Sequence, residues 1–589
     1  MKALSADSDS LMLRKTNEQV LIADAQKPFD LVEVLLNEQQ VLTAVDSFAQ
    51  LHAKQAPPMH GEVYRDLIPL SAPQPGQQYI FEVNLDACSG CKSCVVACHN
   101  LNGLEEAENW RDVGLLVGGT SEQPLLQHIT TTCHHCIEPA CLIGCPVNAY
   151  DKDPITGIVR HLDDQCIGCQ YCIFKCPYDV PKYSNTKGIV RKCDMCSDRL
   201  ANAEAPACVQ SCPHHAIRIA VADTTDIITD CEANHFLPSA PQPDYSLPTT
   251  RFNTSRALPR NALSANYFKD LPQHAHWPLV IMLVLTQLSV GSFIIHHCFP
   301  QVLRLCQANL TTISAFSTFE EELGGLTVLA SLSLGLLGLI ASIFHLGRPA
   351  FAFRAILGIR RSWLSREIFA FGCFAMLAVL YTIATFLMPS SFELSNSLAA
   401  LTSLAGLCGL LSSIFVYVDT PRETWSSFYT GSRFTLTAVI LGLPTTLLLL
   451  SILSVFSTST DFSIVMLDFS VPVSKAILLM TSIKLISELV ILMNLKQRRH
   501  TPQRRTAVLL TTKLSGVLLL RIAAAVVGGI VFPSIVLSQG AITGGNGYTP
   551  LFYLVMISLS WICLLIGELL ERFLFFTSVT TQRMPGISP

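Results

Sequence analysis

Sixteen cysteines between positions 88 and 212 constrain the fold of this chain more than any other feature. The third group of four follows the C-x2-C-x2-C-x3-C-P run of two-cluster ferredoxins, and the first follows it except for the closing proline. Soft thiolates at this spacing favour iron–sulfur clusters, so the region is expected to relay electrons. The four groups are Cys88, Cys91, Cys94 and Cys98; Cys133, Cys136, Cys141 and Cys145; Cys166, Cys169, Cys172 and Cys176; and Cys193, Cys196, Cys208 and Cys212.

Zinc sites and disulfides are the two alternatives for this pattern. Zinc ribbons also use C-x2-C pairs, but they rarely carry a third cysteine two residues further on. A disulfide framework needs an oxidising compartment, and the N-terminal region resembles no secretory signal. Iron–sulfur ligation is therefore favoured over both.

The ferredoxin rule, in which the last cysteine of a group binds the other cluster of a pair, predicts four [4Fe–4S] clusters. The spacing alone does not show this crossing. Groups two and three are expected to form one pair, and groups one and four another. The expected ligand sets are Cys133, Cys136, Cys141 and Cys176; Cys166, Cys169, Cys172 and Cys145; Cys88, Cys91, Cys94 and Cys212; and Cys193, Cys196, Cys208 and Cys98.

Hydropathy divides the 589 residues into a polar part and an apolar part. Only 14% of residues are charged and the mean hydropathy is +0.42, and the apolar surplus begins at Trp277. A bilayer-spanning helix needs about 20 apolar residues, and a buried soluble core is the less favoured alternative. The net charge of −4 gives no indication of nucleic-acid binding. Eight runs fit a span, at 277–299, 323–344, 368–388, 397–418, 434–456, 473–495, 515–537 and 550–570.

The expected architecture is an α+β double ferredoxin-like iron–sulfur domain fused to an all-α eight-helix transmembrane bundle. Residues 1–78 form an N-terminal extension with one helix at 30–54 and a linker. Residues 79–235 form the four-cluster domain, 236–275 an irregular tether, and 276–589 the membrane anchor.

Basic residues predict how the bundle is oriented. Arginine and lysine fill the loops after helices two, four and six and the tail after helix eight, whereas the opposite loops hold almost none. Short cytoplasmic loops carry this excess. The pattern predicts a multi-pass protein of the inner (cytoplasmic) membrane with the cluster domain on the cytoplasmic side. The first 30 residues also lack an apolar export segment and a twin-arginine pair.

Both parts of the chain resemble subunits of the dimethyl sulfoxide reductase family of molybdoenzymes. The cysteine groups resemble its iron–sulfur electron-transfer subunit. Four short motifs resemble its anchor subunit: HAHWPLVIMLVLTQLSVG (274–291), HLGRPAFAFRAILG (345–358), SWLSREI (362–368) and GELLERFLFF (567–576). The nitrate-reductase branch has a tryptophan where this chain has Cys169, so no three-iron cluster is expected. Fusion of the two subunits and a cytoplasmic cluster domain depart from the respiratory members.

The resemblance implies that quinol, menaquinol in particular, is oxidised at the anchor. It also implies that electrons pass to a separate molybdopterin-containing catalytic subunit, with the membrane lipid and the quinone pool as further partners. A histidine in the HLG motif and a glutamate entering helix three are implicated at the family's quinol site, here His345 and Glu367. The alternative for both is interfacial anchoring. Arg348 could orient a quinone oxygen or extend to the interface.

Other ionisable residues fall within the apolar runs. Glu488, Arg521 and Glu568 are expected to form a structural ion pair or, as an alternative, a proton path. Lys484 has no assigned role.

No molybdopterin domain, nucleotide fingerprint or P-loop is visible in the sequence, so this chain is expected to be a non-catalytic subunit of an oxidoreductase complex. Two alternatives stay open. One is reverse transfer from a dehydrogenase or hydrogenase to quinone, because cluster potentials span a wide range. The other is an ion-translocating or scaffold membrane module.

Overall fold

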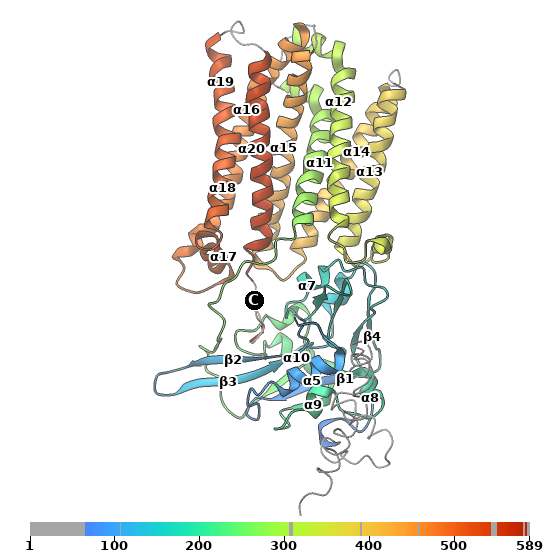
Figure 1. The fold of residues 1–589 in the computed structure, drawn as a ribbon, viewed down its shortest axis with the longest axis vertical. Coiled ribbons are helices and arrows are strands. Elements are labelled where there is room, and N and C mark those ends of the chain that lie inside the picture. Colours follow the sequence, from blue (N-terminus) through green and yellow to red (C-terminus); the bar gives the residue numbers. More distant parts are fainter. Residues whose placement is uncertain are drawn as a thin grey trace, which may run out of the picture. The chain divides into compact units, whose positions relative to one another are not determined.

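The computed structural model describes residues 65–106, 108–305, 310–388, 392–456, 460–543, 550–580 and 584–585. Residues 64–589 make one compact unit. The helix expected at 30–54 lies outside the described residues. Within the described part of this unit, a domain of short strands and short helices adjoins a bundle of long helices (Figure 1).

The cluster domain is built from short strands and short helices. The segment QQYIFEVN forms β1 (Gln77–Asn84), whose apolar side chains are buried. It pairs antiparallel with β8 (Ile217–Asp223), so the two ends of the domain meet in one sheet. Two small antiparallel hairpins follow the second and third cysteine groups: β4 (Tyr150–Lys152) with β5 (Val159–His161), and β6 (Lys182–Ser184) with β7 (Ile189–Arg191).

Short helices carry part of each cysteine group. The last cysteine of a group lies within or just after its helix, whereas the first two precede it. The helices are α5 (Ser93–Asn102), α6 (Ala140–Gly144), α7 (Tyr171–Lys175), α8 (Ser197–Ala201) and α9 (Ala207–Gln210), with α10 (Thr224–Glu232) following β8.

The segment 236–275 differs from the irregular tether expected from its Pro, Ser and Asn content. It contributes β9 (Arg251–Asn253), which pairs parallel with β1, and β10 (Leu263–Ser264). The latter strand extends the long hairpin of β2 (Asp112–Gly119) and β3 (Pro124–Thr131). Strands β9 and β10 are only three and two residues long and pair with distant segments, so local composition does not predict them.

Eight helical segments among the described residues are long and apolar enough to cross a membrane, as expected. Several begin earlier than the apolar runs, because a helix continues into the polar residues at the interface. They are α11 (Trp277–Leu305), α12 (Leu310–Ile343), α13 (Trp363–Leu387), α14 (Phe392–Val418), α15 (Ser427–Phe456), α16 (Thr460–Leu489), the pair α18 (Ser515–Val526) and α19 (Phe532–Thr543), and α20 (Pro550–Thr577).

The seventh span changes its winding at a π-helical turn, Val527–Val531, that joins α18 to α19. A Cβ on Gly529 would lie 2.4 Å from Oγ1 of Thr481, so α16 passes directly against this turn. Single π turns of this kind commonly accommodate such a local irregularity.

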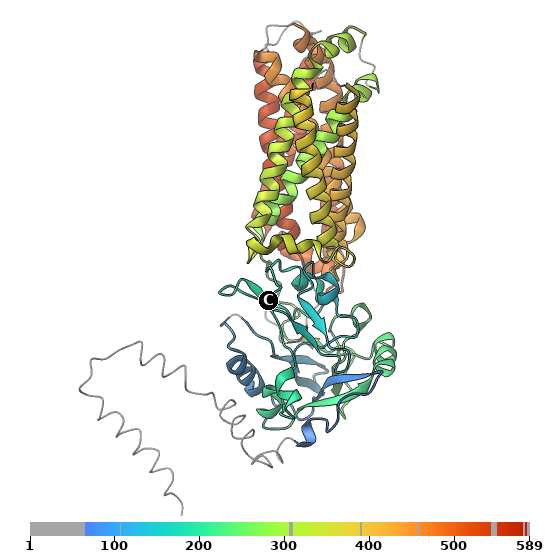
Figure 2. The same ribbon diagram turned by 90° about the vertical axis from the view of Figure 1, so that its right-hand side faces the viewer.

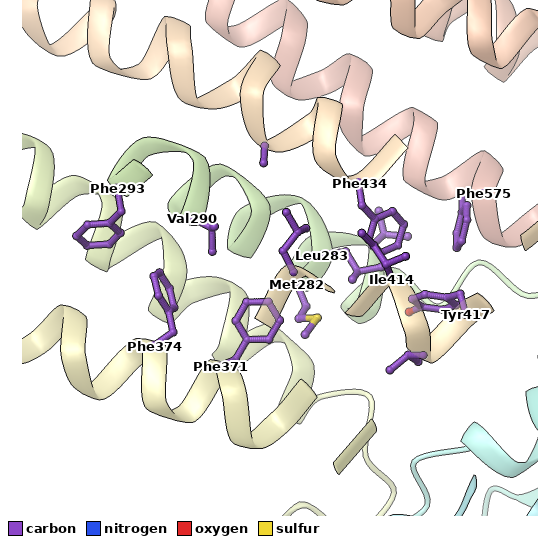
Figure 3. Packing of buried hydrophobic residues seen from close by; sticks show 14 of the residues in the cluster. Met282, Leu283, Val290, Phe293, Phe371, Phe374, Ile414, Tyr417, Phe434 and Phe575 are labelled. Atoms are coloured by element: carbon purple, nitrogen blue, oxygen red, sulfur yellow. The ribbon is translucent and has the colours of Figure 1, made fainter. Parts of the chain in front are cut away.

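Aromatic and aliphatic side chains fill the bundle near the cluster domain (Figure 3). Phe371 and Phe374 of α13 face Met282 and Val290 of α11 in this cluster. Small residues bring other helices close together, because a Cβ on Gly291 would lie 2.0 Å from the carbonyl oxygen of Ala438. Close approach of this kind favours helix association in membranes.

The cluster domain and the linker contact one end of the bundle (Figures 1 and 2). Contacts reach it from the loops after helices two, four and six. Arg348 binds Asp163, Asp419 binds Lys175, and Arg505 binds Asp270. These are the loops that carry the basic residues, so the basic loops and the cluster domain share one side of the bundle.

Candidate functional site

Four sets of four cysteine thiols lie together in the cluster domain. Cys133, Cys136, Cys141 and Cys176 line one small cavity, and Cys98, Cys193, Cys196 and Cys208 line another. In the other two sets, the thiols are close enough to perturb one another's ionisation: Cys145, Cys166, Cys169 and Cys172; and Cys88, Cys91, Cys94 and Cys212. These four sets have the same members as the ligand sets predicted from the sequence. That each set binds a cluster stays a prediction.

Local backbone groups in these sets suit anionic sulfur. Backbone N–H groups donate to Sγ of Cys145 (3.2 Å), Cys193 (3.3 Å) and Cys212 (3.3 Å). No three His, Cys, Asp or Glu side chains in the described ranges are placed to hold a single metal ion. The four cysteine sulfurs that bind a [4Fe–4S] cluster each bind a different iron, so they stand further apart than the four ligands of one tetrahedral zinc, and the arrangement fits a cluster better than zinc.

Two buried cations beside the cysteines were missed by sequence reasoning. Lys192 lines the Cys133 cavity, and Arg111 lines the Cys98 cavity; both are about 2% exposed. Burial alone lowers the pKa of Lys192, but the neighbouring thiolates of Cys133 and Cys141 outweigh it, so the pKa is raised. Each cation therefore offsets the negative charge of thiolates that water does not reach.

The HLG loop between α12 and α13 approaches the cluster domain at backbone distance. A Cβ on Gly347 would lie 2.0 Å from the carbonyl oxygen of Gly188, and one on Gly168 would lie 2.9 Å from the Gly347 nitrogen. Gly168 has a left-handed φ of 70°, which suits glycine. At the other end of the motif, the Gly358 N–H donates to the Pro146 carbonyl at 2.8 Å. Both ends of the motif thus fix the loop to the second and third cysteine groups.

Helix α7 of the third cysteine group inserts beneath the bundle. The Tyr171 hydroxyl donates to the Val416 carbonyl at 2.9 Å, and the Lys175 ammonium binds the Asp419 carboxylate at 2.9 Å. Cys169 and Phe174 pack on the same apolar cluster as Trp425 of the loop after α14. The cysteine set of Cys145, Cys166, Cys169 and Cys172 is therefore the one nearest the membrane helices.

His345 and Glu367 occupy this junction. Burial lowers the pKa of His345 to about 4, although a hydrogen bond from its ring to the Cys169 backbone raises the pKa in part. Its Nε2 atom and Oε1 of Glu367 are buried and have no hydrogen-bond partner among the described residues. Glu367 lies inside α13, which starts at Trp363, and is 4% exposed. The free atoms could bind a ligand with hydroxyl groups.

Arg348 lies in the same loop but its guanidinium points to the cluster domain. Nη1 donates to the Asp163 carbonyl at 2.8 Å, and its backbone N–H donates to the Ile167 carbonyl at 3.1 Å. These contacts hold the loop in place. The proposed contact of Arg348 with quinone stays a prediction.

The charged residues inside the bundle form one network around α20, and Lys484 belongs to it. Arg521 binds Glu488 at 2.9 Å and Glu568 at 3.0 Å. Lys484 pairs with Glu568 and lies 3.9 Å from Glu571. Glu571 also lies 3.4 Å from Arg572 and 3.5 Å from Arg433. The expected ion pairing is therefore present; a proton path stays untested.

Comparisons with known proteins match both parts of the chain. A family model for a 4Fe-4S dicluster domain matches residues 125–222, and the model of the DMSO reductase anchor subunit (DmsC) matches residues 273–577, more than half of the chain.

Similar proteins align with the iron–sulfur part. The B subunit of anaerobic dimethyl sulfoxide reductase from Escherichia coli (strain K12) is 37% identical over 148 residues, which are 24% of this chain and 72% of that protein. The thiosulfate reductase electron transfer subunit PhsB of Salmonella typhi is 34% identical over 153 residues, covering 26% and 79%. The hydrogenase-2 operon protein HybA of Escherichia coli O157:H7 is 35% identical over 156 residues, covering 22% and 48%.

These matches support iron–sulfur clusters as cofactors and a multi-pass membrane protein. The chain therefore belongs to the dimethyl sulfoxide reductase family and is an iron–sulfur electron-transfer subunit fused to a membrane anchor subunit.

Proposed function

We propose that this protein oxidises quinol beside His345 and Glu367 and passes the electrons through four [4Fe–4S] clusters to a separate molybdopterin reductase. The observation that carries the proposal is the junction itself. The His345 ring binds the backbone of Cys169, and Nε2 of His345 and Oε1 of Glu367 are each buried without a hydrogen-bond partner among the described residues. A quinol bound at this junction would lie next to the cysteine set nearest the membrane helices, which contains Cys169.

Each residue at this junction has a defined part. His345 Nε2 and Glu367 Oε1 bind the hydroxyls of the quinol head group, and the surrounding aromatic side chains exclude water. The Gly347 and Arg348 backbone contacts hold the histidine against the third cysteine group. When bound, the iron–sulfur clusters supply one-electron steps that divide the two-electron oxidation of quinol.

The molybdopterin partner is proposed from relatives. The B subunit of dimethyl sulfoxide reductase and the thiosulfate reductase subunit are components of reductases by name. At the other end of the domain, Cys91 is exposed, so the set containing Cys88 and Cys212 is accessible to a docked protein. The similarity to HybA favours a second candidate, transfer from a hydrogenase-type partner into quinone through the same residues.

The cytoplasmic side is proposed for the cluster domain because it contacts the end of the bundle that carries the basic loops. His345 and Glu367 lie at that same end. Protons and electrons from quinol then leave on one side, and turnover moves no net charge. A membrane potential built up by proteoliposomes during quinol-driven reduction would contradict this part.

Anaerobically purified protein mixed with a menaquinol analogue tests the site. We expect the unmodified protein to show rapid cluster reduction by absorbance and electron paramagnetic resonance. H345A and E367Q should slow this by about a hundredfold, while dithionite still reduces every cluster. E393Q, in the first turn of α14 at the other end of the bundle, is the matched control.

Two results would refute the proposal. Wild-type rates in both H345A and E367Q would remove the quinol site, and iron and sulfide analysis that gives fewer than four clusters would remove the full relay. Quinone reduction by the dithionite-reduced protein, with no oxidation of quinol, would instead favour the hydrogenase-type direction.

A further inference from the structure

His276 stands at the junction of the two domains and is not used by the proposed quinol site. It immediately precedes α11, and its side chain is buried. Its ring centroid is 5.1 Å from that of His345 and 5.3 Å from that of Phe174. Its backbone φ is 48°, in the left-handed region that few non-glycine residues adopt. Such strain persists where the surrounding structure fixes a side chain in one direction.

One ring nitrogen of His276 is buried without a partner in the part of the chain that the structure describes. Nδ1 of His276 and Nε2 of His345 are both buried without a hydrogen-bond partner among the described residues. A buried polar atom left unpaired costs about 1–3 kcal/mol. Two neighbouring rings that share this condition indicate a polar ligand or water between them and the quinol head group.

His274 braces the His276 ring from outside. Its Nδ1 accepts a hydrogen bond of 3.2 Å from the backbone N–H of His276, and the two ring centroids are 4.7 Å apart. Because Nδ1 of His274 accepts this bond, the hydrogen of the neutral His274 ring is on Nε2, and the bond fixes the orientation of the ring. His274 is therefore a positioning residue.

A cleft of about 540 Å³ opens next to His276 between the cluster domain and the end of the bundle. Its lining includes the aromatic residues Phe174 and Trp425 and the polar residues Gln273, Arg422 and Glu423. The Phe174 ring lies against both His276 and Trp425. Phe174 therefore contacts His276 on one side and lines the cleft on the other, and the cleft has room for water.

We propose that His276 carries a proton from the bound quinol to the water of this cleft. The inference rests on the quinol site proposed above. Oxidation of one quinol to quinone breaks two O–H bonds and releases two electrons and two protons. The electrons pass singly to the cluster domain. One proton moves from a quinol hydroxyl to the His276 imidazole, then to cleft water, and the imidazole returns to its neutral form. The second proton moves from the other hydroxyl to the Glu367 carboxylate that binds it and is then released to solvent.

The surroundings of His276 suit a carrier rather than a store. Burial, followed by the neighbouring His345 and His274 rings and the Arg422 charge, lowers the pKa of His276 to about 3. The ring is therefore neutral at rest and gives up a proton readily. Negative charge that arrives on the cluster domain during turnover favours the transient imidazolium.

Variants that keep the left-handed backbone test this role in the full protein. Asparagine and glycine both tolerate positive φ, so H276N and H276G are suitable. Stopped-flow reduction of the clusters by a menaquinol analogue should slow about tenfold or more in both, with the KM for quinol nearly unchanged. Added imidazole should restore the rate of H276G, and the slow variants should show a larger solvent deuterium isotope effect. H235A removes a histidine whose side chain is 72% exposed and should keep the full rate.

Wild-type rates in H276N and H276G, or a slow H276G that imidazole does not accelerate, would overturn the role of His276. If H345A and E367Q are slow while the His276 variants are fast, only this inference fails. If quinol does not reduce the clusters of the unmodified protein, both proposals fail. Dithionite reduction to the wild-type extent shows that each variant is intact.

Discussion

Removal of Lys484 should destabilise the bundle by about 3 kcal/mol. Its side chain is fully buried, pairs with Glu568 and donates to Thr437 at 2.6 Å. Breaking a buried ion pair from one side costs about 3–5 kcal/mol, because the remaining charge is left without compensation. In K484M, Glu568 keeps Arg521 at 3.0 Å and Thr437 at 2.7 Å, so the lower end applies.

Removal of Glu568 should cost more. E568Q deprives Lys484 and Arg521 of a shared carboxylate, and Lys484 is left with Glu571 at 3.9 Å. The network already contains four cations and three carboxylates, so this change leaves two positive charges in excess. We expect about 5 kcal/mol. The double variant should lose about 1–3 kcal/mol less than the sum of the two single losses.

Equilibrium unfolding in mixed micelles, followed by tryptophan fluorescence, measures these free energies. K475M is the matched control, since Lys475 is exposed on the same helix. A K484M protein within about 1 kcal/mol of the unmodified one would refute the reasoning, because breaking the buried Lys484–Glu568 pair is expected to cost about 3 kcal/mol even though Glu568 keeps Arg521. Quinol-driven cluster reduction, measured per folded molecule, then separates the two roles considered for the network. An unchanged rate indicates a structural ion pair, and a slowed rate a proton path.

Three further predictions concern the two domains and their placement. G347A should push the loop away from Gly188 and slow quinol-driven cluster reduction at least tenfold while dithionite reduction stays normal; a normal quinol rate would show that the close approach is not needed. K192M should lower the reduction potential of the adjacent clusters by about 100 mV, because a nearby unit charge is worth about 2 kcal/mol at an effective dielectric constant near 20; an unshifted redox titration contradicts this. R360C should react with an impermeant maleimide only in inverted vesicles and F456C only in spheroplasts, read by peptide mass spectrometry; the reverse pattern would place the cluster domain outside.

The sequence predicts features that depend on local spacing. The cysteine groups recur at fixed intervals, and each membrane span is a continuous apolar run, so both were recognised. Several features that depend on distant contacts were not recognised, although the ion pairing of Arg521 with Glu488 and Glu568 was expected. Lys484 binds Glu568 in another helix, and Arg111 reaches the Cys98 set only after β2 and β3 pair. Lys192 directly precedes Cys193 in the sequence, which could have suggested a cation near the cluster. Sequence position alone does not show, however, whether a basic side chain points toward the cysteines or toward solvent.

The contacts between the two domains explain how a fused chain could keep the proposed quinol site in register with the cysteine set nearest the membrane helices, Cys145, Cys166, Cys169 and Cys172. A covalent tether alone would leave the domains free to separate, but the tether is shortened here by β9 and β10, which belong to the sheets of the cluster domain. In the HLG loop, the backbone of Gly347 packs directly against the backbone of Gly188. Because no side chain lies between them, the loop has little room to shift at that point. His345 lies two residues before Gly347 in this loop, and its ring is hydrogen-bonded to the Cys169 backbone. A movement of the loop would therefore change the distance from quinol to the cluster domain and the hydrogen bonding of the quinol together, so neither could be tuned without the other.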